Sequence, residues 1–480
     1  MSDMSDHHVC SAGCAHFSHL NDADLQGEFA EARRSLRASI GGKPTTGAAG
    51  LAGVTQRPLP SKKAGENVSH YYVPANNKTI HWGYFSKVIE PLLKIESGDY
   101  ATIETLTHHS NDDIDRMVKG DPGAESIFHW DAKHKAIDRR GMGPMDHPLG
   151  AGGGMGVHVC TGPIYINGAE PGDVLEVRCI DTMQRPSGNP EFHGKSFGVN
   201  AAANWGFQYH NLITEPKTRE VVTIYEVDSR GENTSARAVY NYRWTPQTDP
   251  FGVVHPTIDY PGVPVDKNTI KPNYDILKGY EIPVRPHFGL IGVAPAEVDY
   301  ASSNPPSYTG GNFDNWRMGK GATIFLPVAV KGAMFTVGDP HASQGDAELC
   351  GTAIECSLTG LFQFILHKRK DLPGTKLYDL DYPLLETASE LVVHGFSSPN
   401  YLKEFAGSAD PIAEICGRSS LNTAMTDAFN KTRRFFMNTR NLSEDEAISL
   451  ISISVDFGIT QVVDGNWGVH AIIKKDIFPK

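Results

Sequence analysis

Short runs of alternating apolar and polar residues recur along the first three quarters of the chain, a pattern typical of strands joined by tight turns. Residues 88–95 and 100–106 lie on either side of a turn at 97–99, and they predict a pair of strands. A further strand, turn and strand are predicted over 157–180, with the turn at 168–173. The pattern therefore predicts a β-rich fold rather than a helical bundle.

The last quarter of the chain has a helical periodicity. Residues 420–438 and 443–457 predict helices, and Ser443 and Glu446 have the spacing of a capping box. We therefore predict a mainly β chain with α+β parts. Its expected divisions are an N-terminal arm and linker at 1–66 and one folded unit at 67–480, which is β-rich to about 365 and more helical beyond.

Composition narrows the class of protein. The chain has 480 residues, of which 40% are hydrophobic and 21% charged, so it is long enough to bury a large core. Its formal charge is −12 and no Lys/Arg block stands out, which argues against nucleic acid as a partner. No apolar run reaches the roughly 18 residues needed to span a bilayer, so we expect no membrane partner.

Cysteine usage favours a cytoplasmic location. The seven cysteines are scattered through a long chain and do not form the framework of a small secreted domain. Arg33 and Arg34 resemble part of a twin-arginine export signal. Residues 38–53 are mostly Gly, Ala and Thr, however, and make a poor hydrophobic segment for export.

The N-terminal arm contains residues that could bind zinc. Cys10, Cys14, His16 and His19 could supply four ligands, of two types, at close spacing. His-rich termini also bind metal adventitiously, so the sequence leaves both interpretations open. Residues 22–40, with acidic residues early and arginines late, predict a helix that follows this cluster.

One stretch, residues 331–356, concentrates polar groups after a short apolar run. Its candidate site residues are Asp339, His341, Gln344, Asp346, Glu348 and Glu355. Side chains at i and i+2 of a strand leave the same face, so Asp339 and His341 can converge on one cation. Glycines such as Gly345 would let the backbone approach a small ligand closely. The alternative interpretation is a solvated acidic turn between two strands.

Three histidines lie near the ends of predicted strands. The strand at 100–106 leads to His108 and His109, and rigid sheets commonly position site residues in this way. If both continue the strand, they point to opposite faces and at most one reaches a site. His158, which precedes Cys160 and Thr161, is either a ligand or a hydrogen-bonded core histidine.

The segment 335–355, FTVGDPHASQGDAELCGTAIE, resembles the signature of the acetamidase/formamidase family, Gly-Asp-x-His-x-x-Gln-Gly-Asp-Gly-Glu followed by Gly-Thr-Ala-Ile-Glu. The resemblance extends to CTGPIYINGAEPGDVLEV at 160–177 and to LTHHSNDDIDRMVKGDPGAES at 106–126, and covers about 70–475. Long joint matches of this kind are far more specific than a three-residue motif. One departure is Ala347, where the family usually has Gly. If that position has a positive φ, Ala strains the turn by about 1 kcal/mol.

The resemblance implies a fold and an activity. The expected fold is a jelly-roll or β-sandwich-like unit with a smaller β barrel and a C-terminal α+β region, assembled as a homo-oligomer. The expected activity is hydrolysis of a short aliphatic amide, formamide or acetamide, to ammonia and the carboxylic acid.

The family's motif positions also suggest roles for individual residues. We expect catalytic roles for Glu355, Glu348, Asp346 and Gln344, substrate binding by Gly345, Thr161 and His109, and metal binding by Asp339, His341 and His158. In this hypothesis a divalent ion lowers the pKa of a water molecule, and Glu355 or Glu348 takes its proton. Either His108 or His109 could replace His158 as a ligand. Mixed imidazole and carboxylate ligation suits zinc first, and also admits calcium, manganese or iron.

Three alternatives remain open from the sequence. Cys350 lies beside Glu348, and Cys160 lies two residues from His158, so a cysteine could act as the nucleophile. A carboxylate mechanism without metal is the second alternative. The third is a small-amide-binding protein that has lost catalysis.

Overall fold

The computed structural model describes residues 54–58, 68–128, 156–228, 235–249, 252, 254–258 and 262–479. The cysteines and histidines of the arm, Arg33, Arg34 and the predicted helix at 22–40 lie outside these residues. Part of the predicted linker forms an edge strand, β1 (Thr55–Pro58), which pairs with β2 (Ser69–Val73).

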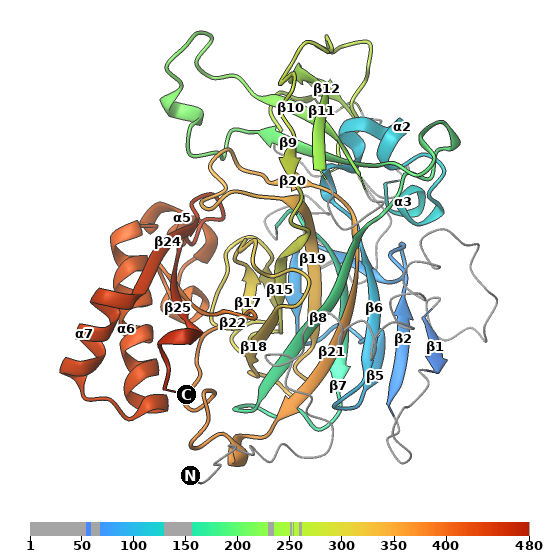
Figure 1. Ribbon diagram of the computed structural model, residues 1–480. Coiled ribbons are helices and arrows are strands. Elements are labelled where there is room, and N and C mark those ends of the chain that lie inside the picture. Colours follow the sequence, from blue (N-terminus) through green and yellow to red (C-terminus); the bar gives the residue numbers. More distant parts are fainter. Residues whose placement is uncertain are drawn as a thin grey trace.

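Two large sheets dominate the structure (Figure 1). In spatial order, the first sheet contains β1, β2, β6 (Tyr100–Thr105), β21 (Leu358–His367), β8 (Val174–Gln184), β18 (Thr323–Pro327), β22 (Leu384–Glu386), β23 (Glu390–Phe396), β25 (Gly468–Lys474) and β24 (Val455–Gln461). The second contains β14 (Ile282–Pro283), β11 (Ser235–Arg243), β10 (Val221–Val227), β9 (Ser196–Ala202), β20 (Ile354–Glu355), β19 (Phe335–Ser343), β15 (His287–Gly292) and β17 (Gly310–Asn312).

A branch of the second sheet forms around β7 (Val159–Ile166), which pairs with β19, β3 (Ile80–Trp82) and β5 (Leu93–Ile95). Two small pairs complete the strands: β12 (Gln247–Thr248) with β13 (Val254–His255), and β4 (Tyr84–Ser86) with β16 (Tyr300–Ser302). The short helices outside the C-terminal region are η3 (His108–Asp113), α2 (Ile114–Met117), α3 (Pro122–Ile127), η4 (Pro190–Phe192), η5 (Tyr209–Asn211) and η6 (Arg369–Asp371). The predicted mainly β class is confirmed.

The main hydrophobic core lies between the two large sheets. Phe362 and Val177 of the first sheet belong to the same buried cluster as Phe288 and Phe335 of the second. The rings of Phe288 and Phe362 are 5.1 Å apart between centroids. Alternation along each strand supplies one apolar face to this cluster, which accounts for the sandwich.

The strands predicted on either side of 97–99 do not pair with each other. β5 pairs with β7 in the second sheet, whereas β6 lies between β2 and β21 in the first. Asp99 stabilises the corner, because its carboxylate accepts the N–H groups of Ser69 at 2.8 Å and Glu96 at 2.9 Å. Alternation predicted β6 closely, but only residues 93–95 of the strand predicted at 88–95 form β5, and the chain passes from one sheet to the other at the turn.

The C-terminal region covers the end of the first sheet with helices, as Figure 1 shows. Its helices are α4 (Tyr401–Glu404), α5 (Pro411–Arg418), α6 (Leu421–Arg440) and α7 (Glu444–Ser454), and η7 (Lys475–Ile477) follows β25. The capping box is confirmed at α7, where Ser443 Oγ accepts the Glu446 N–H at 3.3 Å. This helix is shorter than predicted, because residues from Val455 onward form β24. No helix among the described residues is both long and apolar enough to cross a bilayer.

Replacing Phe362 with Ala should lower the free energy of unfolding by about 3–5 kcal/mol, because the change leaves a cavity in a fully buried core. Urea unfolding followed by fluorescence would measure this loss. Ile213, which is 96% exposed, provides the control, and Ile213→Ala should change stability by no more than about 0.5 kcal/mol. Equal effects of the two substitutions would contradict the assigned core.

Candidate active site

The site is built around His341, which lies in the middle of a sheet. Its cross-strand neighbours are Glu355 on β20 and His287 on β15. Asp339 precedes it by two residues on β19, and the two side chains converge as the sequence predicts, with His341 Nε2 3.1 Å from Asp339 Oδ2. Glu355 Oε1 lies 3.2 Å from the same nitrogen. One imidazole therefore contacts two carboxylates, and all these side chains are buried.

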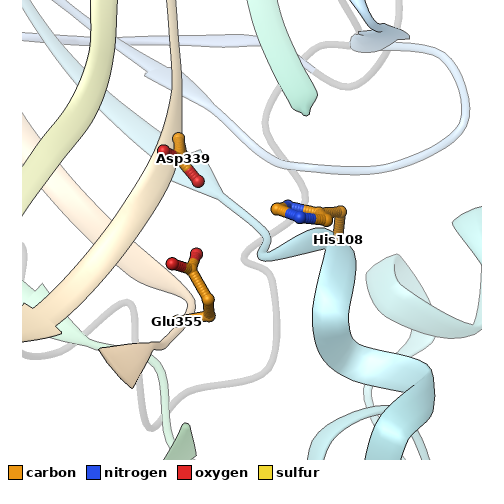
Figure 2. A group of neighbouring side chains, drawn as sticks. All are labelled: His108, Asp339 and Glu355. Carbon is orange, nitrogen blue, oxygen red and sulfur yellow. The ribbon is translucent and has the colours of Figure 1, made fainter. Parts of the chain in front are cut away.

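A first group of possible metal ligands consists of His108, Asp339 and Glu355, whose ligand atoms all lie within 4.8 Å of one another. Figure 2 shows their side chains pointing toward one space from η3, β19 and β20. Each of the three has a buried atom without a hydrogen-bond partner in the described structure: His108 Nδ1, Asp339 Oδ1 and Glu355 Oε2. Buried polar atoms are rarely left unpaired, so these atoms point to a missing ligand.

The first turn of η3 brings both adjacent histidines to this region. Thr107 Oγ1 accepts the His109 N–H at 3.2 Å and begins the turn, so residues 108–109 do not continue the strand as predicted. The two rings lie 4.3 Å apart and both are buried. His109 Nδ1 lies 2.7 Å from Asp112 Oδ2, while His109 Nε2 has no partner among the described residues. Because these residues form a turn, the condition under which at most one of the pair could reach a site does not apply.

A second group consists of Asp314, His341 and Glu348. His341 Nε2 lies 3.9 Å from Asp314 Oδ1 and 4.0 Å from Glu348 Oε1. Both Asp314 oxygens and His341 Nε2 are buried without hydrogen-bond partners in the described chain. The donors of the two groups are imidazole nitrogens and carboxylate oxygens, which is a set that divalent zinc, manganese or iron accepts. These residues therefore fit one or two divalent cations.

The carboxylates of the site repel one another. Burial, followed by the charge of Asp314, raises the pKa of Glu348 well above its ordinary value. Burial and the neighbouring Asp464, from the loop between β24 and β25, raise the pKa of Asp314 in the same way. Burial also raises the pKa of Glu355, against the opposing effect of His341. Such a concentration of buried acids requires protons or a cation to neutralise it.

Asp339 and His341 form an ion pair within this cluster. Burial acts to raise the pKa of Asp339, but His341 and His158 outweigh it and hold that pKa well below its usual value. Burial acts to lower the pKa of His341, but Glu355 and Asp339 outweigh it and raise that pKa well above its usual value.

The predicted residues His158 and Thr161 lie on or beside β7, close to this cluster. His158 Nε2 is 3.7 Å from Asp339 Oδ2, and its Nδ1 is 2.8 Å from Ser303 Oγ. It borders the first group without belonging to it. The Thr161 hydroxyl donates to the Glu104 carbonyl at 2.7 Å, so its hydrogen is already used inside the sheet.

The structure does not bring Asp346 or Gly345 into the cluster. Both are exposed, and the Asp346 carboxylate, 42% exposed, lies 3.3 Å from Arg317 Nη1. Gln344 is buried. Its amide nitrogen donates to the Asp314 carbonyl at 2.8 Å, and its amide oxygen lies 3.1 Å from His341 Nδ1. Gln344 therefore supports ligand groups rather than presenting a free donor.

Two site residues were not predicted from the sequence, Asp314 and Asp464. Asp314 follows β17 in the loop GGNFDNW, where glycines next to a polar residue were a usable signal. Asp464 lies in the sequence DGNWG, which is typical of any turn. Only the pairing of β24 with β25 places this aspartate beside Asp314.

The cysteines considered as nucleophiles are poorly suited to that role. Burial raises the pKa of Cys160 to about 12, and also raises the pKa of Cys350. The Cys350 sulfur lies 3.1 Å from Asn200 Nδ2, outside both ligand groups. A thiol with a raised pKa is rarely present as the reactive thiolate at neutral pH.

Comparison with known proteins gives a consistent relationship. Residues 298–480 match the model of the Acetamidase/Formamidase family. The chain is 32% identical over 216 residues to an acetamidase of Mycolicibacterium smegmatis, covering 41% of this chain and 50% of that protein. It is 28% identical over 247 residues to a formamidase of Methylophilus methylotrophus, covering 48% and 56%. The chain thus matches about half the length of these curated relatives.

Solved structures resemble a larger part of the fold. A crystal structure of an acetamidase from Bacillus halodurans superposes with a TM-score of 0.54 at 19% identity, covering 85% of this chain and 98% of that one. An acetamidase from Yersinia enterocolitica gives a TM-score of 0.52 at 20% identity, covering 87% and 95%. At these identities the likeness supports the fold alone.

Ala347 provides a test of backbone strain beside the site. Its φ is 80°, a region that favours glycine, and its backbone is hydrogen-bonded to Thr460 and Val462. Replacing Ala347 with Gly should stabilise the protein by up to about 1 kcal/mol, because it removes the Cβ strain without removing a contact of the buried acids. Differential scanning calorimetry would measure the change, and a lower Tm in the glycine variant would contradict it.

The buried acids predict how a cation affects stability. Folding raises the pKa values of Asp314, Glu348 and Asp464. Their contribution to the stability of the fold is therefore present at low pH and is lost as the pH rises above about 4. The pKa of His341 is also raised, and its contribution to stability is lost at higher pH. The pKa of Asp339 is lowered, so its contribution to stability changes with pH in the opposite direction. The gain in Tm on adding zinc to chelator-treated protein should therefore be larger at pH 8 than at pH 5.5. A gain that is independent of pH would contradict this account.

Proposed function

We propose that this chain, which matches the model of the Acetamidase/Formamidase family over residues 298–480, hydrolyses a short aliphatic amide, such as formamide or acetamide, to ammonia and the carboxylic acid. The observation that carries the proposal is the pair of ligand groups that share the space around His341, with unpaired nitrogen and oxygen atoms in both. An unactivated amide needs a polarised carbonyl, a stronger nucleophile and a protonated leaving nitrogen. The cluster contains groups suited to each need.

In this proposal His108 and Asp339 of the first group, and the second group, Asp314, His341 and Glu348, hold divalent metal, with zinc the first choice. Glu355 lies beside these ligands and stays free to carry a proton. A bound divalent cation supplies Lewis-acid polarisation of the amide carbonyl and lowers the pKa of water. The sequence suggested one metal site formed by Asp339, His341 and His158. In the structure Asp339 and His341 belong to different ligand groups, so this proposal uses the two groups instead.

Glu355 is our choice for the proton carrier. Its Oε1 accepts the Ala353 N–H at 3.0 Å, which fixes the carboxylate, while Oε2 is buried and unpaired within the described residues. Burial raises its pKa, which brings a carboxylate closer to the range of an effective general base. Glu355 would take a proton from the attacking water and deliver it to nitrogen as the C–N bond breaks. Glu348 is the weaker candidate, because its pKa is raised well above the ordinary value.

His109 is suited to binding the substrate. Asp112 orients its ring through Nδ1 and leaves Nε2 unpaired among the described residues. In the neutral ring, hydrogen on Nδ1 makes Nε2 an acceptor for an amide N–H. Burial acts to lower the pKa of His109, but Asp112 outweighs it and raises that pKa, and the protonated ring offers an Nε2 hydrogen to the amide oxygen instead. This geometry supports the substrate-binding role expected from the sequence.

Other interpretations have less support. A cysteine nucleophile would have to overcome the raised pKa values of Cys160 and Cys350. A binding protein without catalysis would have little need for so many buried carboxylates, which are costly to hold together. The expected homo-oligomer and cytoplasmic location stay predictions.

The decisive experiment is ammonia release from formamide and acetamide by purified protein, with metal analysis of the same sample. Chelator treatment should abolish release and added zinc should restore it. Glu355→Gln should lower kcat about 10²–10⁴-fold, because it removes the proton carrier. Glu281→Gln, at an exposed glutamate paired with Arg237, is the matched control and should keep full activity. Full turnover by the Glu355 variant would overturn the assigned role, and absence of turnover in wild type with bound metal would overturn the proposed function.

A further inference from the structure

His287 contacts the site from behind His341. The two residues are directly paired across β15 and β19, and His287 is fully buried. His287 Nε2 lies 3.0 Å from His341 Nδ1, and the rings meet edge to face at 84°. His341 therefore has one nitrogen toward His287 and the other toward the carboxylates of the site.

The hydrogen bonds around His287 fix which nitrogen carries its proton. His287 Nδ1 lies 2.7 Å from the Arg285 carbonyl oxygen, which can only accept, so Nδ1 must be the donor. A neutral imidazole carries one hydrogen, and a second hydrogen on Nε2 would make His287 a fully buried cation beside His341. Its Nε2 is therefore a bare acceptor.

The position of Gln344 is consistent with a hydrogen on His341 Nδ1 that points toward His287 Nε2. The Gln344 amide nitrogen donates to the Asp314 carbonyl at 2.8 Å, which turns its oxygen toward both histidines. That oxygen is 3.1 Å from His341 Nδ1 and 2.9 Å from His287 Nε2. The three facing atoms are thus two acceptors and His341 Nδ1. One hydrogen on His341 Nδ1, placed between His287 Nε2 and the Gln344 oxygen, gives both of these close acceptors the same donor.

We propose that His287 is a positioning residue that keeps hydrogen on His341 Nδ1 and so directs the His341 Nε2 lone pair to a bound divalent cation. His341 Nε2 has no hydrogen-bond partner in the described structure, although Asp339 and Glu355 oxygens are near it. Partners behind a metal-binding histidine fix its tautomer and ring orientation. The inference rests on the proposed function only in taking a cation as the ligand of His341.

Nitrogen-15 NMR of histidine-labelled protein shows which ring nitrogen of each histidine carries hydrogen, and needs no variant. In cation-free wild-type protein, His287 should have a protonated Nδ1 and a bare Nε2 from pH 5.5 to 8. With zinc bound, His341 should have a protonated Nδ1 and a bare, shifted Nε2. A His287 ring protonated at Nε2, in either state, would overturn the proposal.

Zinc binding measured by calorimetry tests whether His287 strengthens the affinity of the site for a cation. His287→Phe keeps a ring but removes the acceptor, and should weaken zinc binding by about 10–100-fold. His287→Gln offers an amide oxygen to His341 Nδ1 and should recover much of this loss. His70→Phe is the matched control, because it replaces another buried, hydrogen-bonded histidine on the distant strand β2, and should bind zinc like wild type.

Unchanged zinc affinity in His287→Phe, or no recovery in His287→Gln when both variants are folded by circular dichroism, would overturn the positioning role. These readouts do not depend on turnover. If zinc and the tautomers behave as described but no amide is hydrolysed, the proposed function fails and the inference about His287 stands. If amides are hydrolysed but His287 is protonated at Nε2, only the inference fails.

Discussion

The main constraint on the structure is the free-energy cost of burying several carboxylates around one imidazole. Asp314, Asp339, Glu348 and Glu355 all lie near His341 Nε2, and a single positive ring cannot neutralise four negative charges. Taking each charge out of water costs several kcal/mol unless a counter-charge is present. The raised pKa values of three of the four are one expression of this cost. A divalent cation would relieve this cost with less proton uptake, and the surrounding framework holds the acids in place.

The framework meets this demand by using rigid strands for the central residues and short turns for the others. Asp339, His341 and Glu355 lie on paired strands, whose hydrogen bonds fix their positions. His108 begins a capped turn, while Asp314 and Glu348 both have φ of 48°. Positive φ is costly for residues other than glycine and is typically retained where function requires it. Asp339 on β19 also has φ of 48°, so three residues with this backbone strain direct a carboxylate toward the site.

Sequence patterns predicted the strands better than their partners, and the central residues better than the outer ones. Period-two alternation predicted β6 and the convergence of Asp339 with His341, because both depend only on local geometry. Alternation carries no information about which sheet a strand joins, so β5 and β6 were wrongly paired. Asp346 illustrates the same limit at the site. It lies two residues before Glu348, but the loop after β19 is not an extended strand and leaves Asp346 at the surface beside Arg317.

The C-terminal α+β region belongs to the site, although its helices suggest a separate appendage. The loop between β24 and β25 brings Asp464 against Asp314, and β24 also hydrogen-bonds to Ala347 at the base of Glu348. Asn466 secures this loop, because its amide donates to the carbonyls of Pro306 at 2.9 Å and Ser398 at 2.7 Å. Helix α6 packs against the adjacent strands β23 and β25 and supplies Phe435 and Phe436 to their core. Loosening this helix layer would therefore disturb the carboxylates through β24 and its loop.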